Sequence, residues 1–203
     1  GVGFDALDKD ALLRRGARVA YTPGVLDDCV ADLAFALLLD ATRGLSESDR
    51  FVRRGDWSQS RFGIRTRASG KRLGIFGMGR IGSTVARRAS GFDMDVAYHN
   101  RRPVEGSSHQ YLPSLLELAR WADILVITAA GGEGTRHLVN AEVLAALGPQ
   151  GFLVNVARGS VVDEAALAEA LQHQRIAGAG LDVFEDEPRP LPAGLIPLRV
   201  HDT

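Results

Sequence analysis

The chain has 203 residues and is 45% hydrophobic, enough to bury a core in one large domain or in one domain plus part of another. Lys and Arg total 24 and Asp and Glu total 25, so the net charge of -1 gives no electrostatic case for nucleic acid or an anionic membrane as a partner. The sequence shows neither a signal peptide pattern nor an apolar run of bilayer length, and we expect a cytoplasmic protein.

The two ends of the chain suggest a piece of a longer protein. The sequence opens on Gly1 instead of Met, and it stops at "RVHDT" shortly after a Pro-rich stretch. An expressed segment and an incomplete gene would both explain these ends, and the sequence does not choose between them.

The only cysteine, Cys29, excludes an internal disulfide. It lies beside Asp27 and Asp28 without a nearby His. We therefore interpret Cys29 as a small buried hydrophobic residue and not as a nucleophile.

In chain order, the first strong pattern is a helix in "DDCVADLAFALLLDATRG", residues 27–44. From Val30 to Leu39 this run is apolar nearly all round, and such a helix needs cover on more than one side. It is either a central helix of one domain or a helix shared with a second subunit or domain. We expect the shared helix to lie in the two-fold interface of a homodimer.

From residue 71 onward, apolar strand-like runs alternate with helix-like runs. The expected strands are 72–76, 95–99, 123–128, 151–157 and 177–184, and the expected helices are 83–90, 114–122, 141–147 and 164–173. Capping residues agree with these helices: Ser114 with Glu117, Asn140 and Asp163 at their starts, and Gly148 at a stop. The alternation predicts an α/β fold with a doubly wound parallel sheet covered by helices on both faces.

A glycine fingerprint follows the first of these strands. In "KRLGIFGMGRIGSTVARR", Gly77, Gly79 and Gly82 have the spacing G-x-G-x-x-G and open the next helix. The glycines allow a tight turn, close approach of the backbone to a pyrophosphate, and close helix packing. Because a strand precedes the fingerprint and alternating units follow it, the pattern predicts a dinucleotide site.

The end of the second expected strand, in "AYHNRRPVEG", indicates which dinucleotide binds. In the NAD form of this fold, an Asp or Glu here accepts hydrogen bonds from the ribose hydroxyls. This chain instead offers Asn100, Arg101 and Arg102, while Asp93 and Asp95 lie at the start of the strand and not at its end. Guanidinium groups pair with a 2′-phosphate, so we expect NADP(H) to be preferred over NAD(H). The alternative is that both arginines are solvated surface charges.

Two further segments place charged groups at the carboxyl ends of strands. Arg158 follows the strand in "GFLVNVARGSVVD", where a guanidinium can hold a substrate carboxylate and polarise a carbonyl. Asp182 ends the next strand and can meet a nicotinamide carboxamide. The acids that follow it in "EDEP" could orient a catalytic histidine and raise its pKa, although such a run is more often a solvated loop.

Taken together, these motifs resemble the D-isomer-specific 2-hydroxyacid dehydrogenases, especially the glyoxylate, hydroxypyruvate and hydroxyphenylpyruvate reductases. The resemblance runs from "GVGFDALD" through "GKRLGIFGMGRIG", "YHNRRP", "RHLVN" and "NVARGSVVDEAAL" to "GAGLDVFEDEP". It implies that Arg158 binds the substrate, that Glu187 pairs with a catalytic histidine, and that the amides of Val2 and Gly3 hold the substrate carboxylate. Members with "NRR" after the second strand are typically those that prefer NADP.

The chain departs from the family's pattern in two ways. Only the last piece of the family's flavodoxin-like substrate domain is present, so we divide the chain into a remnant of that domain (1–22), an NAD(P)-binding Rossmann domain (23–187) and a truncated tail (188–203). The family's "PH" motif is missing. We interpret His201 as a tail residue, and we expect surface or core roles for the other histidines, namely His99, His109, His137 and His173.

The resulting hypothesis is an enzyme that transfers a hydride from NADPH to a small 2-oxo acid, with this chain alone inactive. The alternatives are a nucleotide-sensing corepressor on the same scaffold, or a formate or phosphonate dehydrogenase. No metal site is expected. The expected cofactor-binding residues are Gly77, Gly79, Arg80, Ile81, Gly82, Asn100, Arg101, Arg102, Ala157 and Asp182.

Overall fold

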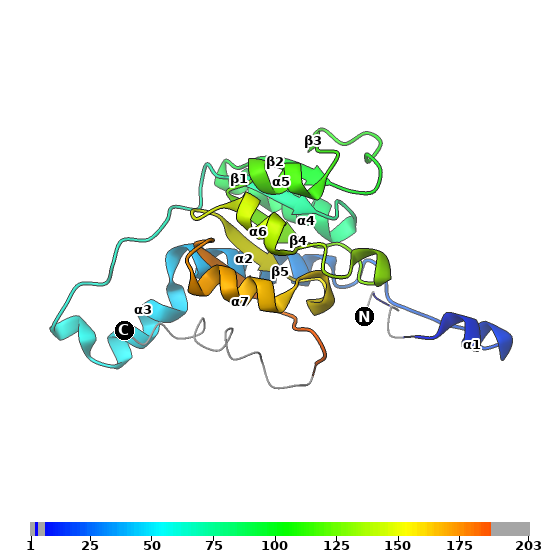
Figure 1. Ribbon diagram of the computed structural model, residues 1–203, viewed down its shortest axis with the longest axis horizontal. Coiled ribbons are helices and arrows are strands. Elements are labelled where there is room, and N and C mark those ends of the chain that lie inside the picture. Colours follow the sequence, from blue (N-terminus) through cyan, green and yellow to red (C-terminus); the bar gives the residue numbers. More distant parts are fainter. Residues whose placement is uncertain (1–2, 4–6, 188–203) are drawn as a thin grey trace.

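The computed structural model describes residue 3 and residues 7–187. Six parallel strands form one sheet in the order β3-β2-β1-β4-β5-β6 (Figure 1). The strands are β1 (Arg72–Phe76), β2 (Asp95–His99), β3 (Gln110–Tyr111), β4 (Ile124–Ile127), β5 (Phe152–Asn155) and β6 (Gly178–Leu181). This confirms the doubly wound parallel sheet. The strand β3 was not expected, because two residues are too short to show a hydrophobic period.

Helices cover both faces of the sheet (Figure 1). The described residues form the helices α1 (Lys9–Arg14), α2 (Asp27–Arg43), α3 (Leu45–Arg53), α4 (Arg80–Ala89), α5 (Leu115–Trp121), α6 (Ala141–Leu147) and α7 (Glu164–Gln172). One core cluster joins the sheet to α5, α6 and α7, and a second joins it to α2 and α4. Short 3-10 turns cover Asp56–Ser58, Ser90–Phe92, Glu133–Thr135 and Gly159–Val161.

The strand β4 shows why the expected strands are apolar throughout. Leu125 and Ile127 belong to the cluster with α5, α6 and α7, whereas Ile124 and Val126 belong to the cluster with α2 and α4. All four side chains are buried. Because successive side chains of a strand point to opposite faces, a sheet covered on both faces needs apolar residues at every position.

The expected helix caps form. Ser114 Oγ accepts the Glu117 N–H at 3.1 Å, Asn140 accepts two N–H groups at the start of α6, and Asp163 accepts the Ala166 N–H at 3.0 Å. Gly148 ends α6 with a φ of 78°, a conformation that favours glycine.

The helix α2 buries one face only. Ala31, Ala34, Phe35 and Leu38 are buried against the sheet and α4, while Cys29 is exposed. The interpretation of Cys29 as a buried residue was therefore wrong. At about 100° per residue, Cys29 lies about 200° from Ala31 and so on the opposite side of the helix.

Two parts of the chain stand away from the layered body in Figure 1. One is α1, and the other is the segment from α3 to residue 66, in which α3 buries no side chain. In this segment Phe51 packs against both Trp57 and Phe62. Within the described ranges, no helix has the length and apolar character needed to cross a bilayer.

Candidate functional site

Four loops meet at the carboxyl edge of the sheet, where parallel strands end together. They are the glycine turn after β1 (77–79), the His137 loop after β4 (128–140), the Arg158 loop after β5 (156–162) and the acidic loop after β6 (182–187). The strand order reverses between β1 and β4, and open α/β sheets bind ligands at such a switch point.

The three fingerprint glycines occupy three different environments. Gly77 has a φ of 109°, and a Cβ there would lie 2.5 Å from the Ala129 nitrogen. A Cβ on Gly82 would collide with the Gly77 carbonyl oxygen, whereas a Cβ on Gly79 would meet no atom within 4 Å. The first and third glycines therefore make the turn and the helix packing possible, and the second borders open space.

The start of α4 has the features that a phosphate group needs. Gly79 is the N-cap, and no side chain caps the helix, so the N–H groups of its first turn face the open space beside Gly79. Ile81 is half-buried against the core, and Arg80 lies 3.4 Å from Asp27 of α2. The residues present thus fit the diphosphate of a dinucleotide.

The segment after β2 is attached to the glycine turn. Asn100 Oδ1 accepts the Met78 N–H at 2.7 Å, and the Tyr111 hydroxyl donates to the Asn100 carbonyl at 3.3 Å. Arg101 and Arg102 are exposed, and among the described residues neither forms an ion pair or a hydrogen bond. The backbone is held next to the fingerprint, while both guanidinium groups are available to a ligand.

The Arg158 loop is shaped by a buried amide. Asn155, at the end of β5, donates to the Arg158 carbonyl at 2.9 Å and accepts the Ala157 N–H at 3.0 Å. Arg158 Nη1 donates to the Ala157 carbonyl at 2.7 Å. Ala157 is buried with both backbone polar groups bonded. Asn155 is a site residue that the sequence reasoning missed, although a polar residue in an apolar strand is a usable signal.

The acidic loop packs directly on the Arg158 loop. A Cβ on Gly159 would collide with the backbone of Phe184 and Glu185, so glycine permits this contact. Glu187 is exposed, and its Oε1 accepts the Phe184 N–H at 2.5 Å. Asp182 is exposed, and its N–H donates to the Asn155 carbonyl at 3.0 Å.

The structure corrects the expectation for His137. Its N–H donates to the Ser160 carbonyl at 2.8 Å, and its Nε2 lies 3.0 Å from Glu185 Oε2, so it lies at the site and not in a remote core or surface. Its φ of 51° is rare for a residue with a side chain. Arg136 pairs with Glu185 at 2.5 Å. Glu185 thereby joins the His137 loop to the acidic loop.

Glu164, the first residue of α7, lies beneath the acidic loop. Its side chain is buried, and its Oε1 accepts the Glu185 N–H at 2.6 Å. Burial raises the pKa of Glu164, the Glu185 N–H opposes that rise, and the nearby carboxylates of Glu185, Asp186 and Glu187 add to it. The described part of the chain contains no cluster of His, Cys, Asp or Glu suited to a metal ion.

The remaining candidates include two residues that the structure does not describe. Val2 and His201 fall outside the described residues, and Gly3 is exposed. His99 is half-buried, stacks on Phe76 and lies 2.9 Å from the Leu112 carbonyl through Nδ1. His173 is exposed and follows α7. Among the described residues, neither His99 nor His173 forms a hydrogen bond or an ion pair with the Arg158 loop.

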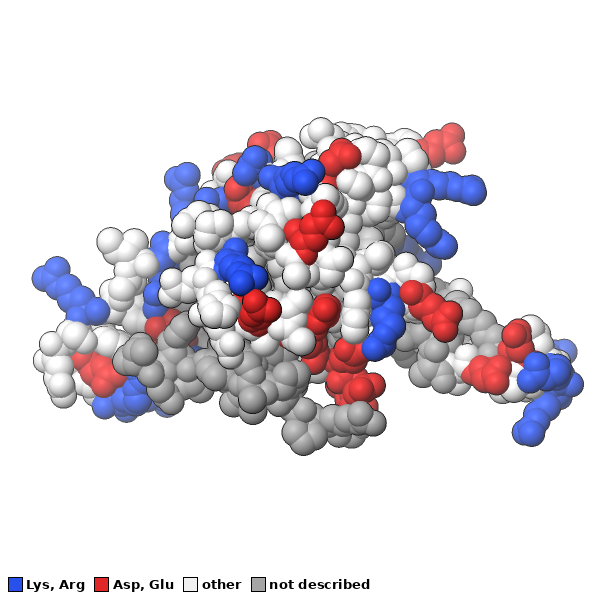
Figure 2. Space-filling model, viewed as in Figure 1, with Lys and Arg blue, Asp and Glu red and all other residues white. Residues whose placement is uncertain are grey.

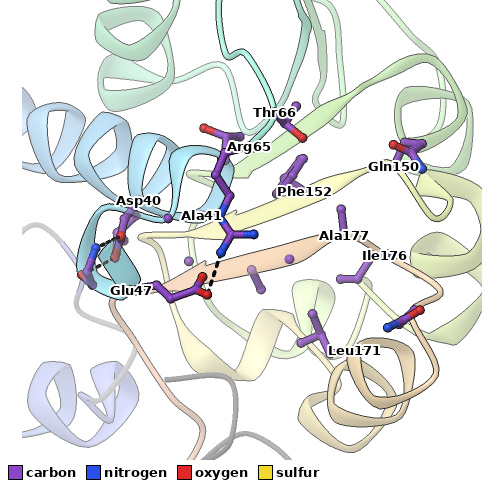
Figure 3. A pocket seen from close by; sticks show the side chains of 18 of the residues that line it. Asp40, Ala41, Glu47, Arg65, Thr66, Gln150, Phe152, Leu171, Ile176 and Ala177 are labelled. Atoms are coloured by element: carbon purple, nitrogen blue, oxygen red, sulfur yellow. Dashed lines mark hydrogen bonds and ion pairs between the residues drawn. The ribbon is translucent and has the colours of Figure 1, made fainter. Parts of the chain in front are cut away.

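A groove of about 830 Å³ is remote from this edge. It runs between α2, the start of α3 and the free side of β6 (Figure 3). An ion pair of 2.6 Å between Glu47 and Arg65 spans it. Because the groove is lined by residues that precede β5 and β6, such as Gln150 and Ala177, it opens toward the amino ends of the strands. We therefore do not assign the dinucleotide to it.

The surface charge is mixed. On the face drawn in Figure 2, side chains of both signs alternate, and acidic side chains gather near the end of the described chain. This distribution agrees with the near-neutral net charge of the sequence.

Comparisons with known proteins agree with this geometry. Residues 35–200 match the model of the D-isomer-specific 2-hydroxyacid dehydrogenase NAD-binding domain. The chain is 47% identical to hydroxyphenylpyruvate reductase of Plectranthus scutellarioides over 92% of its length and 60% of that protein's. It is 45% identical to 2-ketogluconate reductase of Gluconobacter oxydans over 96% of its length and 63% of that protein's.

A solved structure is similar over nearly the whole chain. The NADPH-dependent glyoxylate/hydroxypyruvate reductase of Sinorhizobium meliloti, in complex with NADP and malonate, superposes with a TM-score of 0.93 at 45% identity. The match covers 98% of this chain and 63% of that one, so this chain spans less than two thirds of these relatives. The chain belongs to the D-isomer-specific 2-hydroxyacid dehydrogenase family.

Proposed function

We propose that the complete gene product containing this chain reduces a small 2-oxo acid to the D-2-hydroxy acid with NADPH. The observation that carries this proposal is the meeting of an uncapped, glycine-bordered helix start, two exposed arginines after β2 and the Arg158 loop at one edge of the sheet. The names of the similar proteins support a 2-oxo acid reductase.

The cofactor-binding residues would act through their backbone and their charge. The N–H groups at the start of α4, including those of Arg80 and Ile81, would bind the diphosphate. Arg101 and Arg102 would bind the 2′-phosphate, and Asn100 would hold them in place through Met78. Asp182 would accept a hydrogen bond from the nicotinamide carboxamide. The bound dinucleotide supplies the hydride.

The substrate-binding residues would position and polarise the 2-oxo acid. The Arg158 guanidinium would pair with the substrate carboxylate and stabilise the charge that develops on the carbonyl oxygen. The amides of Val2 and Gly3 would hold the same carboxylate from the other side. Glu187 would orient the histidine that donates the proton, because among the described residues only one of its carboxylate oxygens has a hydrogen-bond partner.

We further propose that the protein is a homodimer formed through the exposed face of α2. Cys29, Leu33 and Ala36 lie on this face, and Leu33 is 37% exposed. A helix with apolar residues on both its buried and its outer face is typical of a helix shared between two subunits.

A panel of 2-oxo acids tests the proposed activity. The complete gene product is assayed with NADPH and glyoxylate, hydroxypyruvate, hydroxyphenylpyruvate or 2-ketogluconate, because the similar proteins are named for these compounds. We expect turnover of at least one compound, and the variant Arg158→Ala should lose it while binding NADPH within about twofold of the unmodified protein. The absence of turnover on every compound would refute the proposal.

A further inference from the structure

The contacts beneath the acidic loop point to an additional residue in the proposed reaction. We propose that Glu164 is a positioning residue that fixes the acidic loop, and with it Glu187, against the Arg158 loop. The effect of Glu164 on turnover rests on the proposed function. Its effect on the position of the acidic loop rests on the structure alone.

The first observation is the hydrogen bond from the loop to a buried carboxylate. The Glu185 N–H donates to Glu164 Oε1 at 2.6 Å, and Glu164 is only 8% exposed. A hydrogen bond that is shielded from water inside a protein is electrostatically stronger than the same bond at the surface. Glu185 is two residues before Glu187, so this bond fixes the loop close to the carboxylate that is proposed to orient the catalytic histidine.

The second observation is that the support comes from a rigid element. Glu164 begins α7, whose start is capped by Asp163, and Val161 and Val162 just before it are buried in the core. The acidic loop packs on Gly159 and is bound by Glu164, and the residues between these two positions include the buried Val161 and Val162. One short segment holds both loops.

The third observation is a second attachment of the same loop. The Glu185 side chain reaches Arg136 at 2.5 Å and His137 at 3.0 Å, so its backbone and side chain are bound in different directions. A misplacement of about 1 Å can cost about 100-fold in rate, and an arrangement of this kind prevents such a shift at Glu187.

Two substitutions at Glu164 keep the volume of the side chain and differ in whether a hydrogen-bond acceptor remains. Glu164→Leu keeps the volume and removes the acceptor, whereas Glu164→Gln keeps an Oε1 that can accept the same N–H. Glu169→Leu and Glu169→Gln are the controls, because Glu169 lies on α7 with its side chain 56% exposed. NADPH binding by fluorescence titration reports whether each variant folds.

In the 203-residue chain, amide hydrogen exchange at Glu185 measures the bond directly. We expect protection at Glu185 to fall about tenfold or more in Glu164→Leu, to persist in Glu164→Gln, and to be unchanged in both controls. Protection that persists in Glu164→Leu would overturn the inference, whatever the enzymatic activity.

In the complete gene product, kinetics measure the consequence. We expect Glu164→Leu to lower kcat about 10- to 100-fold with the KM for NADPH within about twofold, and Glu164→Gln to restore kcat to within about threefold. An unchanged kcat in Glu164→Leu would overturn the positioning role. If the unmodified protein turns over no 2-oxo acid, the proposed function fails, and the exchange measurement alone decides whether Glu164 fixes the loop.

Discussion

Arg101 and Arg102 are two exposed charges whose role depends on their position beside the fingerprint. They follow Asn100, which is bonded to Met78 of the glycine turn, so a nucleotide on α4 would place its ribose near them. A solvated surface arginine contributes little to stability, and the same arginine opposite a phosphate contributes charge-assisted hydrogen bonds.

The double variant Arg101→Ala, Arg102→Ala tests this role. A charge-assisted contact is worth about 1.5–3 kcal/mol, so we expect the unmodified chain to bind NADPH about tenfold or more tightly than NADH. The double variant should lose most of that preference by weakening NADPH binding alone. Fluorescence titration with both nucleotides measures it, and Arg175→Ala, a substitution just after α7, is the control. A preference that survives in the double variant would refute the assignment.

Glu164 gives a prediction about stability and pH. Because burial and the facing carboxylates of Glu185, Asp186 and Glu187 raise its pKa above the ordinary value of 4.5, the folded state favours protonated Glu164. The resulting stabilisation is present below about pH 4.5 and is lost as pH rises through the higher folded pKa. Arg136 and His137, which pair with Glu185, face the same loop.

The variant Glu164→Gln cannot ionise and should avoid this loss. We expect its melting temperature to exceed that of the unmodified chain by a larger margin at pH 7 than at pH 4. The two margins should differ by a few °C, because 1 kcal/mol corresponds to about 2–4 °C in a domain of this size. Thermal unfolding followed by circular dichroism at both pH values measures the difference. Glu169→Gln should show no such trend, and a margin that shrinks toward pH 7 contradicts the argument.

Individual site residues differed in how well the sequence could predict them. The spacing of Gly77, Gly79 and Gly82 predicts a tight turn and close helix packing, and the structure shows the turn at Gly77 and the close packing at Gly82. The pairing of His137 with Glu185 spans 48 positions, and that of Glu164 with Glu185 spans 21. Such contacts depend on how loops pack across neighbouring strands, and no local pattern encodes them.

At the scale of elements, the long periodic segments were predictable and the irregular ones were not. The strands 72–76 and 95–99 agree with β1 and β2 at both ends. The helix α4 begins three residues before the expected start at residue 83, because the fingerprint residues Arg80 to Gly82 are already helical. Apolar character all round α2 could not show which face would be buried, and the prediction for Cys29 failed for that reason.

The exposed face of α2 supports a test of the homodimer. Leu33→Arg places a charge on the exposed face without touching the buried residues Ala34 and Phe35. Light scattering at micromolar concentration should show a dimer for the unmodified chain and a monomer for the variant, with NADPH binding per chain unchanged. Ala165→Arg, exposed on α7 across the sheet, is the control and should remain dimeric. An unmodified chain that is monomeric would refute the interface.

At the scale of the whole molecule, apolar exposure is concentrated outside the layered body. Leu13 of α1 is 74% exposed, and Trp57 and Ile64 near α3 are 65% and 100% exposed. By comparison, the central strands β4 and β5 between the two helical layers are buried at every position. That residues 1–22 belong to a different domain from the sheet stays a prediction, and the chain covers 63% of the length of these relatives.

The final prediction separates binding from chemistry in the chain of residues 1–203. We expect this chain to bind NADPH, because the fingerprint, Arg101, Arg102 and Asp182 lie along one edge of one folded sheet. We expect it to reduce no 2-oxo acid at a useful rate. A general acid contributes about 10²–10⁴-fold, and among the described residues the histidine nearest the Arg158 loop, His137, is already paired with Glu185.

The comparison that decides this prediction uses NADPH with glyoxylate or hydroxypyruvate. It measures the 203-residue chain, its His201→Ala and His137→Ala variants, and the complete gene product. Turnover by the complete gene product alone would agree with the prediction, because positioning and exclusion of water would then come from residues beyond the described sheet. Strong activity of the 203-residue chain that disappears in His201→Ala would show that His201 is the proton donor. Activity that disappears in His137→Ala instead would assign the role of proton donor to His137, which is paired with Glu185. Glu185, and not Glu187, would then be the acid that orients the catalytic histidine.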